Sequence, residues 1–206
     1  MKNLDKIKTF ISESEQGTIF TTPEWLEAVA PGKWDYITTE SAGSIKACMP
    51  IILNEKLGLT ICNMPPFTQS LGIMYPAYEG KYAEVLTRKM NALSELISVI
   101  PKNSYFRQRL HPSITNWLPF YWREYNQSTR YTYIIKDLAN QDKIWKSFRS
   151  NIRQEIRKAS KTIKIFEEDD FESLSFCIDS TFARQKNKNF RSEEHTSELQ
   201  SLTNLV

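Results

Sequence analysis

The residues best suited to chemistry in this chain lie between Trp145 and Lys164, in the segment WKSFRSNIRQEIRKASKTIK. Four basic residues recur there at every fourth position: Arg149, Arg153, Arg157 and Lys161. Four apolar residues recur with the same spacing, about 100° away around a helix: Ile144, Phe148, Ile152 and Ile156. A helix that packs one face on a core and carries guanidinium groups beside it is suited to bind phosphate or carboxylate. The alternative is a solvated basic surface helix, since runs of charge usually face water.

A second candidate site comprises Gln69, Arg107 and Arg109. Gln69 lies in a proline-rich loop, where its amide can either bind a sugar or peptide group of a substrate or cap loop carbonyls. Arg107 and Arg109 alternate along an expected strand and therefore share one of its faces. Two guanidinium groups on one face repel each other unless an anion or acidic side chains neutralise them. A phosphate-bearing acceptor such as a nucleotide sugar fits this pair, and structural pairing with a glutamate is the alternative.

Catalytic residues cannot be assigned from the sequence. His111, at the end of the same expected strand, is a candidate general base because imidazole titrates near neutral pH. A lone histidine without an evident partner is more often structural. The sequence contains no Ser/His/Asp set, paired-carboxylate signature, metal-ligand spacing or phosphate-binding loop, so we predict no metal and no permanently bound cofactor. Four tyrosines are expected to be core or groove aromatics: Tyr121, Tyr125, Tyr131 and Tyr133.

The composition indicates a globular protein. The chain has 206 residues, of which 40% are hydrophobic and 25% charged, which suits one large or two small domains. No stretch has the apolar length of a membrane span and the N-terminus lacks the core of a signal peptide, so we expect a cytoplasmic protein. The three cysteines, Cys48, Cys62 and Cys177, are far apart in the sequence. We therefore expect them to be buried apolar residues and not part of a disulfide or a zinc site.

Charge is distributed unevenly along the chain. The formal net charge of +3 is milder than in dedicated nucleic-acid binders. Residues 143–164, however, contain eight basic residues and a single acid, Glu155, which we expect to pair with Arg149, Arg153 or Lys158. Five acids follow in residues 167–172, where the next helix is expected to begin and its dipole favours carboxylates.

The C-terminal segment has an unusual sequence. Residues 191–201 read RSEEHTSELQS, which resembles the in-frame translation of a sequencing-library adapter over eleven consecutive residues. We therefore expect Arg191–Val206 to be foreign and disordered, with the native sequence continuing only to about Phe190. Without that segment the chain has 26 basic and 21 acidic residues, a net charge of +5.

Periodicity predicts an α+β, or mixed α/β, fold with a partly antiparallel sheet. Helices are expected over residues 4–14, 23–30, 79–100, 142–161 and 171–184, with Thr22 as an N-cap before Pro23. Strands are expected over residues 34–39, 44–53, 58–62, 105–110, 129–136 and 162–166, and TRYTYIIK at 129–136 has the strongest strand pattern.

Four segments together resemble the FemAB-like branch of the GNAT-fold acyltransferases. They are IFTTPEWLEA (19–28), PPFTQSLG (65–72), TRYTYIIKDL (129–138) and WKSFRSNIRQEIRKA (145–159). The resemblance spans most of residues 19–185 and rests on the order and spacing of loose patterns. It implies one complete GNAT-like half over residues 1–138 and the truncated start of a second half over residues 139–190.

The resemblance also implies an activity. Such proteins transfer an acyl or aminoacyl group to an amine on a cell-envelope or polysaccharide precursor, with acyl-CoA or aminoacyl-tRNA as the donor. The residues expected to bind the donor or a phosphate-bearing acceptor are Gln69, Arg107, Arg109, Arg149, Arg153 and Arg157. The transfer needs an amine held in line with an ester or thioester, and no covalent nucleophile.

This chain departs from the GNAT pattern in one respect. A typical GNAT domain holds the CoA pyrophosphate in a Q/R-x-x-G-x-G/A turn at a helix N-terminus. Gln69–Gly72 has the wrong spacing for that turn, so we expect either that the donor is not CoA or that the turn lies in the missing part of the second half. We expect the 206-residue chain alone to be inactive. The alternative function is a non-catalytic nucleic-acid (tRNA) binding module that uses the basic helix 143–164.

Overall fold

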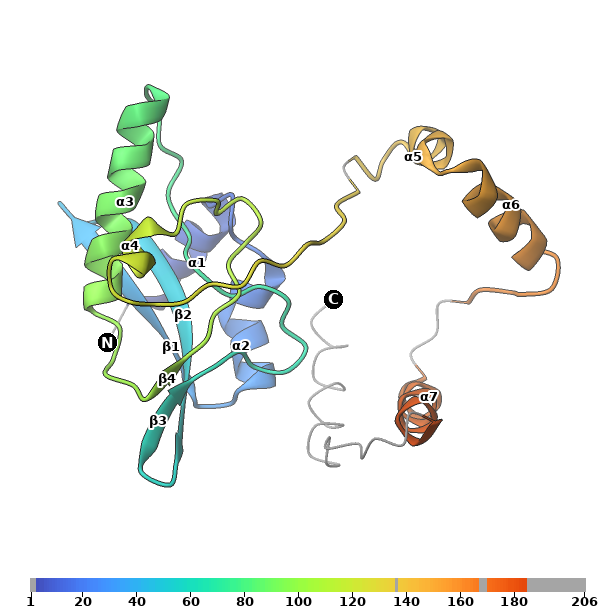
Figure 1. The fold of residues 1–206 in the computed structure, drawn as a ribbon, viewed down its shortest axis with the longest axis horizontal. Helices are drawn as coiled ribbons and strands as arrows, with labels where there is room; N and C mark the ends of the chain where they lie inside the picture. Colours follow the sequence, from blue (N-terminus) through green and yellow to red (C-terminus); the bar gives the residue numbers. More distant parts are fainter. Residues whose placement is uncertain (1–2, 136, 167–169, 185–206) are drawn as a thin grey trace. The chain divides into compact units, whose positions relative to one another are not determined.

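The computed structural model describes residues 3–135, 137–166 and 170–184 (Figure 1). The described residues of Met1–Asn126 form one compact unit, and Gln127–Thr181 forms another. The domain boundary expected at residue 138 stays a prediction. Residues 191–206, predicted to be foreign, lie outside the described residues.

The first unit is built on an antiparallel hairpin. Strands β1 (Trp34–Ser41) and β2 (Ser44–Lys56) pair on either side of a two-residue turn. Both turn residues, Ala42 and Gly43, have positive φ, 48° and 75°. Two left-handed residues match the right-handed twist of the paired strands, which is why this turn closes a tight hairpin. The strands predicted on both sides of this turn are confirmed.

Two further strands complete the sheet. Strand β3 (Leu59–Cys62) pairs antiparallel with β2, and β4 (Tyr105–Phe106) pairs parallel with β3, which gives the order β1-β2-β3-β4. This mixed sheet confirms the α+β class. The strand expected over 105–110 is too long, because only its first two residues pair with β3 and Arg109 pairs instead with Leu71 as an isolated bridge.

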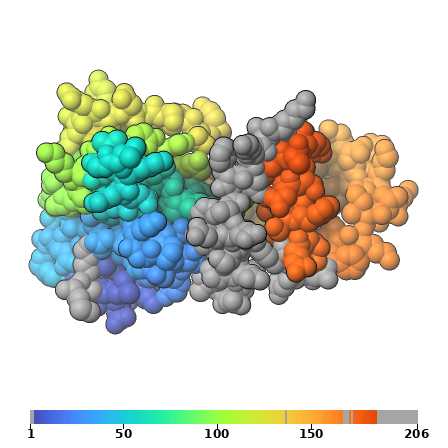
Figure 2. Space-filling model, turned by 90° about the horizontal axis from the view of Figure 1, so that it is seen from below, coloured from blue at the N-terminus to red at the C-terminus, as the bar shows by residue number. Residues whose placement is uncertain are grey.

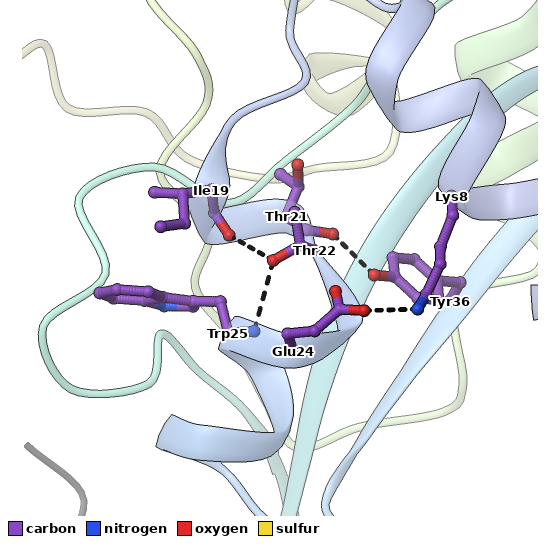
Figure 3. Close-up of polar contacts among 7 residues, drawn as sticks. All are labelled: Lys8, Ile19, Thr21, Thr22, Glu24, Trp25 and Tyr36. Atoms are coloured by element: carbon purple, nitrogen blue, oxygen red, sulfur yellow. Dashed lines mark hydrogen bonds and ion pairs between the residues drawn. The ribbon is translucent and has the colours of Figure 1, made fainter. Parts of the chain in front are cut away.

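The first helices begin where their caps predict. Helix α1 (Leu4–Glu13) is capped by Asn3, and α2 (Pro23–Val29) follows the short 3-10 helix η1 (Ile19–Thr21). The Thr22 side chain accepts a hydrogen bond from the backbone N–H of Trp25 at 3.3 Å (Figure 3). Pro23 occupies the first helical position. The cap expected at Thr22 is confirmed, because its hydroxyl satisfies an N–H that the helix leaves unpaired.

Strand β2 is buried on both faces. Along β2, Cys48 and Ile52 belong to one core cluster and Ala47, Met49 and Ile51 to another. The first cluster also contains buried residues of α1 and α2, and the second contains those of α3 (Tyr82–Ser98) (Figure 1). The blue, cyan and green segments of this unit pack closely in the space-filling view (Figure 2). Burial on two faces explains why β2 reads as a continuous apolar run.

An aromatic group packs beside the second core cluster. Helix α4 (Leu118–Tyr121) contributes Phe120, whose ring lies 5.3 Å from Tyr125 in an edge-to-face arrangement. Phe106 of β4 packs edge-on against the same Tyr125 ring at 5.3 Å. Tyr125 thus packs on the core as expected, whereas Tyr121 is 61% exposed.

Two of the three cysteines are buried. Cys48 and Cys62 lie in the core, as predicted, and burial raises the pKa of the Cys62 thiol. Cys177 is exposed on α7 (Phe171–Arg184), so the prediction of a buried residue is wrong there.

Hydrogen bonds from the Ser173 side chain and backbone to Asp170, at the start of α7, lower the pKa of this carboxyl. Residues 167–169 of the predicted acidic cluster lie outside the described residues.

The second unit contains α5 (Gln141–Ser147), α6 (Ser150–Ala159) and most of α7. The single helix expected over 142–161 is wrong, because Phe148 and Arg149 are extended, with ψ of 143° and 150°. The Ser147 hydroxyl donates to the carbonyl of Ile144 at 2.6 Å, a local bond that competes with helix propagation. The ring of Trp145 then packs on Phe148 at 6.2 Å and under the guanidinium of Arg157 at 5.5 Å, which stabilises the bend.

Two predicted strands of this unit are not formed. Residues 129–135 and 163–166 have no regular structure, and residue 136 lies outside the described residues. Tyr131, Tyr133 and Ile165 are each more than 90% exposed, so both tyrosines were wrongly predicted to be core or groove residues. Strand propensity needs a partner strand and a packed face to be realised. No strand is formed among the described residues of Gln127–Thr181.

Tyr36 links β1 to η1 from inside the core. It is 1% exposed, and its hydroxyl donates to the carbonyl of Thr21 at 2.6 Å (Figure 3). Burial raises the pKa of Tyr36 well above its ordinary value, and burial raises the pKa of Tyr75 in the same way. The exposed pair Lys8–Glu24 lies nearby, and its hydrogen bond lowers the pKa of Glu24 (Figure 3).

The raised pKa of Tyr36 predicts a loss of stability in alkali. Above about pH 10 a tyrosine in the unfolded chain ionises while the folded protein keeps Tyr36 neutral. The free energy of unfolding should therefore fall by up to about 1.4 kcal/mol per pH unit for each such tyrosine. Tyr36→Phe should lose about 1 kcal/mol at pH 8 and show a shallower decline above pH 10.

Urea unfolding at pH 8, 10 and 11 measures both effects. Tyr82→Phe is the matched control, because Tyr82 is 82% exposed. An unchanged alkaline slope in Tyr36→Phe would contradict the assigned role of burial.

Candidate anion-binding site

A loop of eight residues, Asn63 to Ser70, is closed at its base by the segment that carries two arginines. The backbone N–H of Arg107 donates to the carbonyl of Cys62 at 2.8 Å, immediately before the loop. The N–H of Leu71, immediately after the loop, donates to the carbonyl of Arg109 at 2.8 Å. Both ends of the loop are therefore fixed relative to these two arginines.

The side chains of Arg107 and Arg109 share a face, as predicted, although the regular strand ends at Phe106. The intervening Gln108 points to β2, where its amide nitrogen donates to the carbonyl of Pro50 at 3.3 Å. The two arginines and the predicted residue Gln69 line one hollow of about 440 Å³. Its remaining lining residues are Asn63, Met64, Pro65, Pro66, Phe67 and Thr68.

The electrostatics of this hollow favour an anion. No acidic side chain lines it, and within the described residues neither arginine forms an ion pair. Arg107 is exposed, whereas the Nε atom of Arg109 is buried and has no hydrogen-bond partner among the described residues. A buried donor without a partner is unfavourable by about 1–3 kcal/mol. The predicted alternative, in which Arg107 or Arg109 pairs with a glutamate, is not found among the described residues.

Gly72 allows the close contact on which the hollow depends. A Cβ atom there would lie 2.9 Å from Cδ2 and 3.2 Å from Cα of Leu110, which is too close for an ordinary contact. The sequence indicated a glycine near Gln69 without a role for it. Its role is to let residues 71–73 lie against residues 109–110.

His111 has a structural role. Its Nδ1 accepts a hydrogen bond from the backbone N–H of Ser113 at 3.2 Å and lies 2.9 Å from the Ser113 hydroxyl. The N–H of Ile114 closes the turn on the carbonyl of His111 at 2.9 Å. Gln16, 3% exposed, donates from its amide to the Ser113 hydroxyl at 3.0 Å. This network fixes the turn after Arg109 and occupies one ring nitrogen of the imidazole.

The other predicted arginines lie in the second unit. Arg149 is the exposed N-cap residue of α6, Arg153 is half-buried, and Arg157 stacks on Trp145. Helix α6 ends at Ala159, so Lys161 and Lys164, predicted to belong to the basic helix, lie beyond its end. The expected pairing of Glu155 with a basic neighbour is not found among the described residues.

A second hollow, of about 520 Å³, lies at residues 137–142 and has no evident chemistry. Its lining residues are near neighbours in sequence, and Asn140 there caps α5 by accepting a hydrogen bond from the N–H of Lys143 at 3.0 Å.

In the part of the chain that the structure describes, no three His, Cys, Asp or Glu side chains gather as a metal site would require. No helix there combines the length and apolar character needed to cross a bilayer.

Comparison with protein-family models, with curated proteins and with solved structures finds no match for this chain. The FemAB-like resemblance therefore stays a prediction. Within the described residues, the hollow at Gln69, Arg107 and Arg109 is the candidate site whose geometry bears on function.

Gly72→Ala should destabilise the first unit by about 1–3 kcal/mol, because the added methyl group forces the 71–73 segment away from Leu110. Thermal or urea unfolding measures the loss. The double variant Gly72→Ala with Leu110→Ala should lose less stability than the sum of the two single variants, since Leu110→Ala removes the Cδ2 contact. Equal stability of Gly72→Ala and the parent would show that the two segments are not in close contact.

Proposed function

We propose that this protein is a FemAB-like N-acyltransferase or aminoacyltransferase with a GNAT-like fold, and that the hollow at Gln69, Arg107 and Arg109 binds its phosphate-bearing acceptor. The observation that carries the proposal is the buried Nε of Arg109, which has no hydrogen-bond partner among the described residues and lies beside a second guanidinium group in a hollow that no described acidic side chain lines. A mixed sheet whose strand β2 is buried on both faces supports the fold part of the proposal.

The chemistry assigned to these residues is binding and orientation. Arginine presents a planar set of N–H donors that fits two phosphate oxygens at once. Arg109 is the inner anchor because it is the more buried, and Arg107 is the outer one. Gln69 is exposed at the hollow, where its amide can bind a sugar or peptide group of the acceptor.

In the proposed reaction the acceptor amine attacks the carbonyl of the acyl or aminoacyl donor. The new amide bond forms as the thiol of CoA or the ribose hydroxyl of tRNA leaves with a proton. Holding the two substrates in line provides much of the rate, so a site can work by positioning. The group that accepts the amine proton is not assigned. We place the reaction in the cytoplasm, on an envelope or polysaccharide precursor.

The anion site is tested directly with inorganic pyrophosphate as the probe. The parent chain should bind it, and Arg109→Ala and Arg107→Ala should each weaken binding about tenfold or more, as expected for a lost charged hydrogen bond. Isothermal titration calorimetry gives the affinities. Arg88→Ala is the matched control, because Arg88 is an exposed arginine of α3 outside the hollow. Pyrophosphate binding that survives Arg109→Ala unchanged would contradict the proposal.

A second candidate function is nucleic-acid binding by residues 143–164. The eight basic residues there form no ion pair within the described residues, and all except the half-buried Arg153 are exposed. The two functions are compatible if the donor is a charged tRNA. The break at Phe148–Arg149 divides this basic surface between two short helices.

Filter binding of tRNA over a series of salt concentrations tests this candidate. Each phosphate contact contributes about 0.7–0.9 to the slope of log affinity against log salt. Arg153→Ala with Arg157→Ala should therefore lose most of the binding and lower that slope by about 1.5. Binding that does not depend on salt would exclude a phosphate-directed mode.

A further inference from the structure

The lining loop of the anion site is hydrogen-bonded to a helix that does not line the site. The indole N–H of Trp25, in the first turn of α2, donates to the Thr68 hydroxyl at 3.0 Å. That hydroxyl in turn donates to the carbonyl of Pro66 at 3.0 Å. Thr68 is 5% exposed, so its hydroxyl depends on protein partners. Two consecutive hydrogen bonds thus connect α2 to the backbone of the loop.

Trp25 is itself held firmly. Its backbone N–H is bound by the Thr22 cap, and the ring of Phe20 packs edge-on against the indole at 5.0 Å. In Figure 3 the indole points away from the Lys8–Glu24 pair. The ring also packs against the first core cluster. A residue fixed by a cap, a ring contact and the core can hold a neighbouring loop in place.

The loop needs such a support. Phe67 has φ of 54°, a left-handed conformation that is unfavourable for a residue with a bulky side chain. The two hydrogen bonds meet the chain on both sides of Phe67, at Pro66 and at Thr68. Because Gln69 follows directly, its position relative to Arg107 and Arg109 depends on the same support.

We propose that Trp25 is a positioning residue for the anion site: through the Thr68 hydroxyl it holds the 66–69 side of the hollow against Arg107 and Arg109. Trp25 does not line the hollow, so it acts only through Thr68. This inference rests on the proposed anion site. It assigns to Trp25, a residue of the segment 19–28, an effect on the affinity of the hollow for its anion.

The test uses the full chain, with inorganic pyrophosphate as the probe in isothermal titration calorimetry. Trp25→Phe keeps an aromatic ring and removes the N–H, and Thr68→Val keeps the shape and removes the hydroxyl. Each should weaken pyrophosphate about fivefold to tenfold, the size expected for one buried hydrogen bond. Thr68→Ser keeps the hydroxyl and should bind as the parent does. The double variant should bind no more weakly than the weaker single variant, because both changes break the same connection.

Trp34→Phe is the control for a lost indole bond. The indole N–H of Trp34 donates to the Glu27 carboxylate at 2.6 Å. Glu27 belongs to α2, as Trp25 does, but neither Trp34 nor Glu27 lines the hollow. This variant should keep the parent affinity for pyrophosphate. Thermal melting of every variant establishes that it is folded at the temperature of the titration, and Trp25→Phe alone suffices if Thr68→Val does not fold.

The outcomes separate the two proposals. A parent chain that binds pyrophosphate, with Trp25→Phe and Thr68→Val binding it equally well, overturns the positioning role and leaves the anion site standing. Additive losses in the double variant, or a Thr68→Ser variant as weak as Thr68→Val, also overturn it. A parent chain that does not bind pyrophosphate overturns the anion site and the positioning role together.

Discussion

Two backbone hydrogen bonds hold the candidate site together: the N–H of Arg107 donates to the carbonyl of Cys62, and the N–H of Leu71 donates to the carbonyl of Arg109. They join a loop of eight residues to a segment more than thirty residues further along the chain. Both bonds use backbone atoms of the two arginines themselves. The ends of the loop are therefore held at a fixed distance from the backbone that carries the two guanidinium groups. The glycine at position 72 makes the second bond possible by leaving room for Leu110.

Local physical rules were enough to predict the elements that frame this site. The cap at Thr22 depends on neighbouring residues only and was predicted, as were the two strands that pair on either side of Ala42–Gly43. The shared face of Arg107 and Arg109 was also predicted, since alternation needs an extended backbone and not a complete strand. The contact between Trp25 and Thr68 was not, because nothing local relates residues 43 positions apart.

The failed predictions have a common physical origin. Residues 129–136 have strong strand propensity, but propensity without a paired neighbour does not produce a strand. The basic stripe at 143–164 has helical spacing, yet the Ser147 hydroxyl and the Trp145 ring stabilise a break in it. In each case the local pattern was read correctly, and the surroundings of the segment decided its conformation.

The candidate site depends on Arg109, whose Nε atom is buried and has no hydrogen-bond partner within the described residues. The Nε–H resonances of the arginines in a ¹H–¹⁵N NMR spectrum, recorded during titration with pyrophosphate, test it most directly. The account predicts that the Arg109 signal, assigned with Arg109→Lys, shifts and saturates with the probe while the Arg88 signal does not move. Equal, small shifts of all arginine signals would show that pyrophosphate binds without a site and would contradict the account.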